Sequence, residues 1–99
     1  MYVAVWKFSV RTGCEAQFEA AYRSDGDWSR LFRQAPGYVA TELVRIPGAV
    51  PRYLTVDRWD SERHWHDFKT LFSAEYAALD KHCEQWTDGE ELVAAGAVS

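Results

Sequence analysis

The spacing of apolar residues changes along the chain in an order that few folds accommodate. Apolar residues alternate over residues 2–10, 38–46, 52–59 and 92–98, which is typical of strands. Between the first and second of these segments, and again between the third and fourth, apolar residues recur every three or four positions, as on one face of a helix. The order strand, helix, strand, strand, helix, strand predicts a ferredoxin-like, split βαβ fold of the α+β class. Its four strands would form an antiparallel sheet with helices on one face.

Turn residues and helix caps mark the boundaries in the first half of the chain. Thr12 followed by Glu15 fits a capping box, which predicts a Thr cap at the start of the first helix. Asp27 caps a second short helix, and the Ala-Pro-Gly sequence at residues 35–37 stops it. Residues 47–51 contain two prolines and a glycine, so they are expected to join two strands as a hairpin.

The second half contains a long helical stretch and one more strand. Asp60 or Ser61 caps the helix, whose apolar spacing continues to about residue 85 with a break predicted at residues 70–73. Asp88-Gly89 is expected to end this region in a turn. No linker or repeat divides the sequence, so residues 1–99 are expected to form a single domain.

Composition argues against several kinds of partner. The formal net charge is −4 and the basic residues are scattered singly, so no basic stretch can follow a nucleic-acid backbone. No apolar run approaches the roughly 20 residues that span a bilayer, and the first residues are strand-like rather than a targeting leader. We therefore expect a cytoplasmic protein that binds neither nucleic acid nor membrane. Cys14 and Cys83 are interpreted as small apolar side chains.

Both faces of the predicted sheet carry apolar residues. On the first strand Val3 and Val5 stand opposite Ala4 and Trp6, and the other strands show the same mixture. The helices can cover only one face of a four-stranded sheet. When the other face is exposed to solvent, apolar and polar residues alternate more strictly along each strand than they do here. A second copy of the chain is the simplest cover for the other face, so the sequence predicts a homodimer that packs sheet to sheet.

Aromatic residues are abundant for a chain of this length. They make up 15% of the residues, with five each of Trp, Tyr and Phe. Rigid aromatic side chains in excess of what a small core holds are typical of a ligand pocket or a subunit interface. Stripes such as Trp65, Phe68 and Phe72 have helical spacing and are also compatible with an ordinary core. A pocket for a flat aromatic molecule and an aromatic core both remain open at this stage.

Two sets of residues have the spacing needed for acid–base chemistry. Tyr76 and Asp80 are one helical turn apart and share a helix face. Tyr53, Asp57 and Trp59 share a face of the third strand. If these faces meet in a pocket, Asp57 or Asp80 can act as a base whose pKa is raised by burial. The alternative is a solvated Asp80 carboxylate and a Tyr76 that packs in the core.

The histidines do not predict a metal site. His64 and His66 are two residues apart on a helix, so their side chains point in different directions. Glu62 and His66 share a face, but two ligands do not make a metal site. Asp25-Gly26-Asp27 is too short for a calcium loop and is interpreted as a turn. We therefore expect no metal and no other bound cofactor.

Four segments together resemble a known family. Residues 8–18, 35–38, 52–61 and 65–68 are similar in order and spacing to the antibiotic biosynthesis monooxygenase family, which belongs to the dimeric α/β barrels. The resemblance implies two identical subunits, each with a pocket between its sheet and its helices. Some members oxidise aromatic polyketides or quinols with O₂ and without metal or flavin, others open the ring of haem, and many have no known activity.

The resemblance also implies roles for individual residues. Trp65, Tyr76 and Arg45 correspond loosely to the Trp, Tyr and Arg of the polyketide-oxidising branch. In the haem-degrading branch an Asn aligns with Trp6, and the haem-ligating His falls near Asp80, where this chain has none. Both branches use an Asn in the pocket, and this chain contains no Asn. Haem binding or degradation is accordingly the least favoured of the functions considered.

The sequence therefore leads to one hypothesis and one alternative. The hypothesis is a cofactor-independent monooxygenase that acts on a small aromatic or quinol-like substrate in a pocket between the sheet and the helices. The alternative is a homodimer that binds a small molecule and does no chemistry. The candidate catalytic residues are Asp57, Tyr76 and Asp80. The candidate substrate contacts are Trp6, Tyr53, Trp59, Trp65 and Phe68.

Overall fold

The chain forms one four-stranded sheet with helices packed on one side of it, as described by a computed structural model of residues 1–99. Along the chain the elements are β1 (Tyr2–Val10), α1 (Glu15–Tyr22), α2 (Asp27–Phe32), β2 (Tyr38–Ile46), β3 (Arg52–Trp59), α3 (Glu62–Leu71), α4 (Ser73–Cys83), the 3₁₀ turn η1 (Glu84–Trp86) and β4 (Thr87–Ala97). The predicted order of strands and helices is confirmed.

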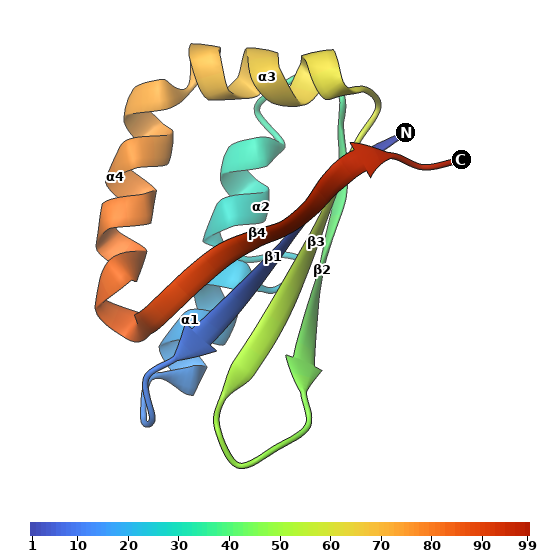
Figure 1. Ribbon diagram of the computed structural model, residues 1–99. Helices are drawn as coiled ribbons and strands as arrows, with labels where there is room; N and C mark the ends of the chain where they lie inside the picture. The colour runs from blue at the N-terminus through green and yellow to red at the C-terminus, as the bar shows by residue number, and fades with distance from the viewer.

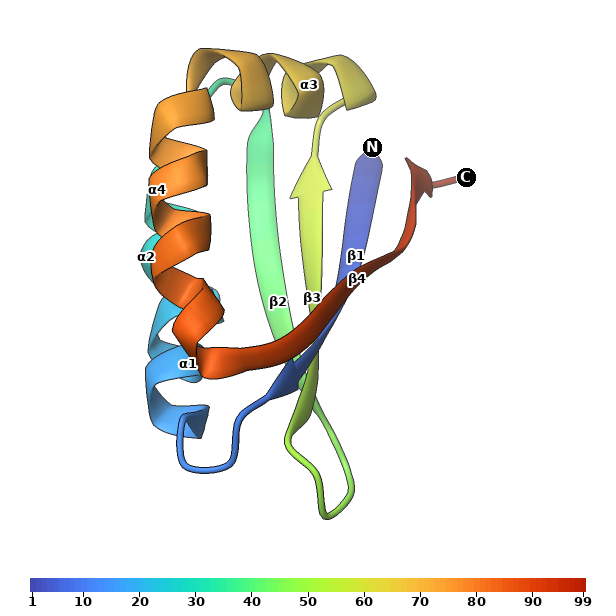
Figure 2. The same cartoon turned by 60° about the vertical axis from the view of Figure 1, so that its left-hand side comes forward.

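The sheet is antiparallel throughout, with strand order β2-β3-β1-β4. Strand β1 is central and pairs with both β3 and β4, whereas β2 and β3 form the predicted hairpin. Figures 1 and 2 show α1, α2 and α4 in one layer beside the sheet, with α3 across one end of the strands. This is the ferredoxin-like arrangement that the sequence predicts. None of the helices combines the length and the apolar character required to cross a membrane.

The last strand begins earlier than predicted. β4 starts at Thr87 rather than at Leu92, so the turn expected just before it is part of the strand. Ser9 pairs with Gly89 and Val10 pairs with Thr87, which leaves the residue between them without a partner. A β-bulge of this kind absorbs one extra residue while the pairing continues on both sides. The prediction of a turn was wrong because the bulge at Asp88 lets the pairing with β1 continue through Gly89 to Thr87.

The helix caps agree with the sequence for α3 and differ for α1 and α2. The predicted cap Asp27 is the first residue of α2, whose N-cap residue is Gly26 and which has no side-chain cap. Ser61 caps α3, and its Oγ accepts a 3.2 Å hydrogen bond from the His64 N–H. The capping box predicted at Thr12 does not form, because α1 begins with Cys14 as its N-cap residue. Gly13 has φ +93°, a left-handed conformation that separates Thr12 from the first helical turn.

The predicted break in the long helical stretch lies at Phe72. Its backbone angles, φ −113° and ψ 29°, end α3 and begin α4. After this residue the chain turns, so that α3 crosses the ends of the strands while α4 runs along the sheet (Figure 2). Trp65 on α3 and Tyr76 on α4 are thereby brought to two sides of one interior space.

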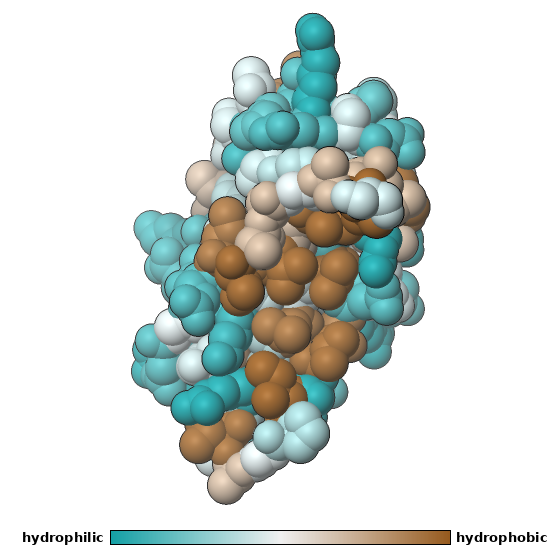
Figure 3. All heavy atoms as spheres, turned by 45° about the vertical axis from the view of Figure 1, so that its right-hand side comes forward, coloured by the Kyte–Doolittle hydropathy of each residue, from teal (hydrophilic) through white to brown (hydrophobic).

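The face of the sheet that points away from the helices is largely apolar. By register it carries Val3 and Val5 of β1, Leu54 and Val56 of β3, and Val44 of β2. In the single chain the β1 and β3 side chains are only half-buried, and Val44 is 44% exposed. Figure 3 shows a continuous apolar surface on this side of the molecule. We call this surface the outer face.

Candidate functional site

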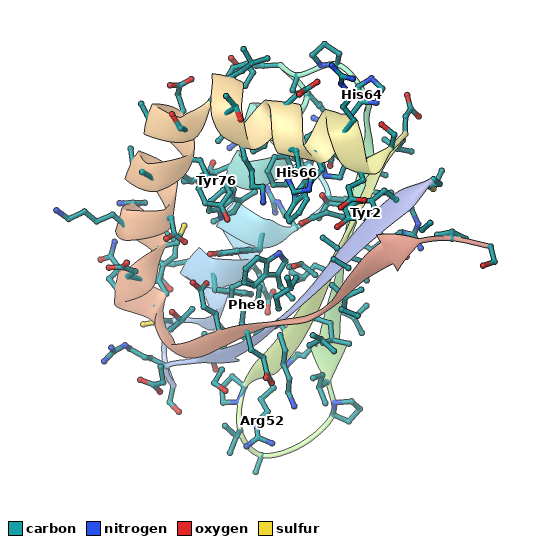
Figure 4. All side chains as sticks on the ribbon, turned by 45° about the horizontal axis from the view of Figure 1, so that its top comes forward. Tyr2, Phe8, Arg52, His64, His66 and Tyr76 are labelled. Carbon is teal, nitrogen blue, oxygen red and sulfur yellow. The ribbon has the colours of Figure 1, made fainter.

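A pocket lies between the inner face of the sheet and the helices. Its cavity volume is about 50 Å³, and the wider space of about 530 Å³ around it includes the solvent at its open mouth. Figure 4 looks into this space, with Phe8 and Tyr76 inside it. Seven of the twelve lining residues are aromatic, and the other five are polar. The lining residues are Trp6, Phe8, Tyr22, Trp28, Phe32, Thr41, Thr55, Asp57, Trp65, Tyr76, Asp80 and Glu90.

The aromatic wall is built from rings that support one another. The Trp28 and Tyr76 rings meet edge to face with centroids 5.1 Å apart, and Tyr2 packs against Trp65 at 5.6 Å. The Trp28 indole N–H is buried without a hydrogen-bond partner. Interlocked aromatic rings hold their positions at little entropic cost, so this wall presents a rigid apolar surface to a ligand.

One basic side chain lies against the aromatic wall without lining the pocket. The Lys69 ammonium is 3.5 Å from the centroid of the Trp65 ring, a cation–π contact between neighbouring turns of α3. Burial lowers the pKa of Lys69. The contact fixes the orientation of Trp65 at the side of the pocket.

The pocket contains a buried carboxylate supported by a chain of hydroxyl groups. Asp57, on β3, is only 7% exposed. Thr41, its partner on β2, donates a 2.7 Å hydrogen bond to Asp57 Oδ1. The Tyr38 hydroxyl donates a 2.8 Å hydrogen bond to Thr41 Oγ1 and also lies 3.2 Å from Ser29 Oγ. Thr41 is the only hydrogen-bond donor to the carboxylate, so Asp57 Oδ2 is free to face a ligand.

Burial changes the acidity of this carboxylate. Removal from water raises the pKa of Asp57 from 3.8 to about 6, although the hydrogen bond from Thr41 acts in the opposite direction. The group is therefore ionised near neutral pH but is a better proton acceptor than an exposed aspartate. A base with a pKa close to the working pH is well suited to general base catalysis.

Two more carboxylates stand at the mouth of the pocket. Asp80 is half-buried on α4, and Glu90 is exposed on β4, where it pairs with Phe8. Partial burial raises the pKa of Glu90, and the negative charge of Asp80 raises it further. Burial raises the pKa of Tyr76 to about 12, assisted by the charges of Asp80, Glu90 and Asp57 in that order. The Tyr76 hydroxyl therefore stays protonated and lies within the field of all three carboxylates.

Five of the eight candidate residues predicted from the sequence line this one pocket. They are Trp6, Asp57, Trp65, Tyr76 and Asp80. The helix pair Tyr76 and Asp80 does face the strand residue Asp57, as the alternation and the helical spacing together predict. What each residue does in the pocket stays a prediction.

The other three candidates lie elsewhere. Trp59 and Phe68 are fully buried and pack on each other with ring centroids 5.4 Å apart, so they belong to the core. Tyr53 is also buried, and its hydroxyl donates a hydrogen bond to Glu19 on α1. Arg45 lies beside Tyr53 rather than in the pocket, 5.6 Å from the ring centroid.

Some lining residues were missed by the sequence reasoning. Glu90 was left out because the last strand was predicted to begin after it. Thr55 lies between Tyr53 and Asp57 on the same strand face, so alternation alone contained the signal for it. Glu42, next to Thr41 on β2, is on the outer face and forms an ion pair with Arg58.

The histidines lie outside the pocket. His64 is held against the Ser61 side chain by a 2.8 Å hydrogen bond, and His66 lies 3.3 Å from Glu62 on the exposed side of α3. No group of three or more His, Cys, Asp or Glu side chains is arranged to hold a metal ion.

The fold and the sequence are both similar to known proteins. The sequence profile of the antibiotic biosynthesis monooxygenase family matches residues 1–78. Among solved structures, a candidate antibiotic biosynthesis monooxygenase from Nitrosomonas europaea has a TM-score of 0.74 and 19% identity over 100% of both chains. The cofactor-independent oxygenase SnoaB from Streptomyces nogalater has a TM-score of 0.74 and 18% identity over 98% of this chain and 94% of its own.

A third similar structure is a dimeric ferredoxin-like protein from an uncultured marine organism. It has a TM-score of 0.72 and 12% identity, over 99% of this chain and 94% of its own. No curated protein sequence matches the chain significantly. At these identities the solved structures establish the fold, whereas the sequence profile covers well over half of the chain. The chain therefore belongs to the antibiotic biosynthesis monooxygenase family.

Proposed function

We propose that this protein is a cofactor-independent monooxygenase that oxidises a small aromatic or quinol-like molecule with O₂. The observation that carries the proposal is the buried Asp57 carboxylate in a pocket walled by aromatic side chains. Family membership and the shared fold of SnoaB, which is described as a cofactor-independent oxygenase, support it. In such a reaction the substrate supplies the electrons. The protein therefore has to provide a base, a proton donor and a pocket from which water is excluded.

The first step is removal of a proton from the substrate. Asp57 Oδ2 accepts the proton of an acidic phenol, which leaves a phenolate, or of a C–H group next to a carbonyl, which leaves an enolate; in both cases the electron pair stays on the substrate. Thr41 holds the other oxygen through its 2.7 Å hydrogen bond, so the carboxylate keeps one orientation during the transfer. Burial favours the protonated product of this step, because the neutral acid requires no solvation by water.

Oxygen then reacts with the substrate anion. One electron passes to O₂ to give superoxide and a substrate radical, which combine through a new C–O bond to form a peroxide. Protonation gives a hydroperoxide, which loses water as the O–O bond and the remaining C–H bond break. The net change is CH₂ plus O₂ giving C=O plus H₂O, with all electrons supplied by the substrate. In this proposal Tyr76, whose pKa is raised to about 12 and which stays protonated, donates a hydrogen bond to the peroxide oxygen.

The assembled form that fits this proposal is a homodimer. The outer face exposes apolar side chains from three strands of one chain, and this is a surface that water would otherwise cover (Figure 3). The fold is shared with a protein described as a dimeric ferredoxin-like protein. A second copy of the chain packed sheet to sheet would bury this face and leave the pocket, on the opposite side of the sheet, intact.

Oxygen uptake with labelled gas tests the proposed reaction. Purified protein without added metal or flavin is supplied with a panel of anthrones and quinols, and consumption of ¹⁸O₂ is followed with an oxygen electrode. We expect one O₂ consumed per substrate and one labelled oxygen atom in the carbonyl product. The Asp57→Asn variant should bind the same substrate and lose most of the turnover. Uptake that is equal in the variant would contradict the role of Asp57.

The absence of Asn supports a second candidate function. Oxidising members of the family use a pocket Asn, and this chain has none. A homodimer that binds a small aromatic molecule without converting it needs only the pocket. Calorimetric binding of an anthrone without any oxygen uptake, in either the wild-type protein or the Asp57→Asn variant, would favour this function over the oxygenase.

A further inference from the structure

The charged groups that line the pocket are all of one sign. Asp57, Asp80 and Glu90 contribute carboxylates, whereas no Lys, Arg or His side chain lines the space. None of the three carboxylates forms an ion pair with a basic side chain. The Lys69 ammonium does not line the pocket and is held over the Trp65 ring. The pocket therefore has a negative potential that the chain itself leaves uncompensated.

The three carboxylates act on one point inside the pocket. Each of them opposes ionisation of the Tyr76 hydroxyl, which lies between the helix wall and the sheet. A negative charge placed beside this hydroxyl would meet the same repulsion. A positive charge beside the Tyr76 hydroxyl would instead be stabilised by the negative potential of the carboxylates, because the energy of a charge in a given potential changes sign with the charge.

The aromatic wall also favours a positively charged organic ligand. The faces of Trp and Tyr rings carry negative charge density and attract an organic cation within about 6 Å of the ring centre. Trp6, Trp28, Trp65 and Tyr76 all line the pocket. Aromatic faces combined with carboxylates are the groups that recognise an alkylammonium, which needs both a counter-charge and a surface for its apolar part.

We propose that the ligand of this pocket is a flat aromatic molecule that carries a protonated amine. The ammonium lies at the mouth, near Asp80 and Glu90, and the ring lies against the aromatic wall and reaches toward Asp57. Asp80 and Glu90 are on α4 and β4, two elements that diverge from their η1 connection (Figure 1). This inference deepens the proposed function and depends on the pocket being its substrate site.

An ammonium on the substrate also resolves a difficulty in the proposed reaction. Deprotonation produces a substrate anion, which the negative potential of the pocket opposes. A positive charge on the same molecule cancels this repulsion and lowers the pKa of the proton that Asp57 removes. The amine is thus a recognition group that also makes the first step easier.

Three ligands of the same shape and different charge test the inference. Naphthalenemethylamine, naphthalenemethanol and naphthalenecarboxylate carry one ring system with a positive, a neutral and a negative substituent near neutral pH. Titration calorimetry with the intact protein gives the three dissociation constants. We expect the amine to bind about 10-fold or more tightly than the alcohol, and the carboxylate to bind most weakly. Equal binding of the amine and the alcohol would overturn the inference.

Charge-neutralising variants locate the effect. Asp80→Asn and Glu90→Gln should each reduce the ratio of amine to alcohol affinity several-fold. Glu75→Gln is the matched control, because this residue is on the exposed side of α4 and carries the same charge. An equal loss of the preference in all three variants would mean that overall charge rather than the pocket attracts the amine. A preference that survives unchanged in both pocket variants would overturn the role of Asp80 and Glu90.

The outcomes separate this inference from the proposed function. Binding of the amine without oxygen uptake from any amine-bearing quinol would refute the oxygenase and keep the ligand class. Oxygen uptake with neutral quinols, together with equal binding of the amine and the alcohol, would refute the ligand class and keep the oxygenase. If none of the three ring compounds binds, the pocket is not an aromatic site and both proposals fail.

Discussion

Thr41 and Asp57 face each other across the β2–β3 pairing, and the Thr41 hydroxyl donates a 2.7 Å hydrogen bond to Asp57 Oδ1. No other side chain or backbone group donates to this buried carboxylate. The hydrogen bond therefore offsets part of the stabilisation that an ionised Asp57 loses on removal from water, and it limits the rise of the pKa to about 6.

Removal of this hydrogen bond should shift the acidity of the site. Thr41→Val preserves the shape of the side chain and deletes the donor, so the pKa of Asp57 should rise further. If Asp57 is the base, the acidic limb of the kcat/KM profile moves to higher pH, because a larger fraction of the enzyme is protonated at a given pH. Thr41→Ser retains the hydroxyl and should keep the wild-type profile. An unchanged acidic limb in Thr41→Val would argue against Asp57 as the base.

The same carboxylate makes stability depend on pH. Its pKa in the folded protein is about 6, above the ordinary value of 3.8, so the folded state holds the proton more tightly than the unfolded state. Its contribution to stability is present below about pH 4 and is lost as the pH rises through about 6. Asp57→Asn removes this loss, and it should raise the free energy of unfolding by up to about 3 kcal/mol at about pH 8.

Urea unfolding at several pH values measures this effect. The difference between Asp57→Asn and the wild-type protein should shrink as the pH falls and nearly vanish at about pH 3, where the wild-type carboxyl is protonated in both states. A difference of the same size at both ends of the range would show that the variant acts through packing rather than through charge.

Much of the fold follows from local sequence signals. β2 and β3 have the predicted bounds because Pro and Gly residues lie on both sides of β2 and before β3, and a helix cap, Ser61, follows β3. β4 differs because a bulge depends on its pairing with β1, which no local pattern in residues 87–98 records. The placement of Glu90 in the pocket depends on that pairing and could not be predicted.

The candidate site, like the fold, was predictable from the sequence only in part. Tyr76, Asp80 and Asp57 meet because helical spacing and strand alternation are local and the fold brings the two faces together. Aromatic identity does not distinguish Trp65, which lines the pocket, from Phe68 one turn later, which is fully buried. That distinction depends on how α3 is rotated against the sheet and on the side chains of α2, which are tertiary properties.

This difference on a single helix can be measured with a pair of variants. Phe68→Ala should reduce the free energy of unfolding by about 3–5 kcal/mol, because it leaves a cavity between the Phe32 and Trp59 rings. Trp65→Ala removes a half-buried side chain and should cost less stability while weakening aromatic ligand binding. Thermal unfolding and calorimetric titration of both variants separate the two roles. Equal loss of stability and unchanged ligand binding in Trp65→Ala would contradict this assignment.

The outer face offers a test of the proposed dimer. Val56 lies on β3, one of the two middle strands of the sheet, and pairs with Val5 on β1, the other middle strand. Val56→Lys places a charge at the centre of a sheet-to-sheet interface, where burial of an unpaired ammonium is costly. In a single chain the same residue faces water, so the fold itself should persist.

Sedimentation velocity distinguishes the dimer from the single folded chain. We expect a mass of two chains for the wild-type protein at micromolar concentration and a mass of one chain for Val56→Lys, with an unchanged circular dichroism spectrum. Ala78→Lys, at an exposed position of α4 away from the outer face, adds the same charge and should remain dimeric. A wild-type mass of one chain would refute the dimer, and a dimeric Val56→Lys would mean that the two copies meet through another surface.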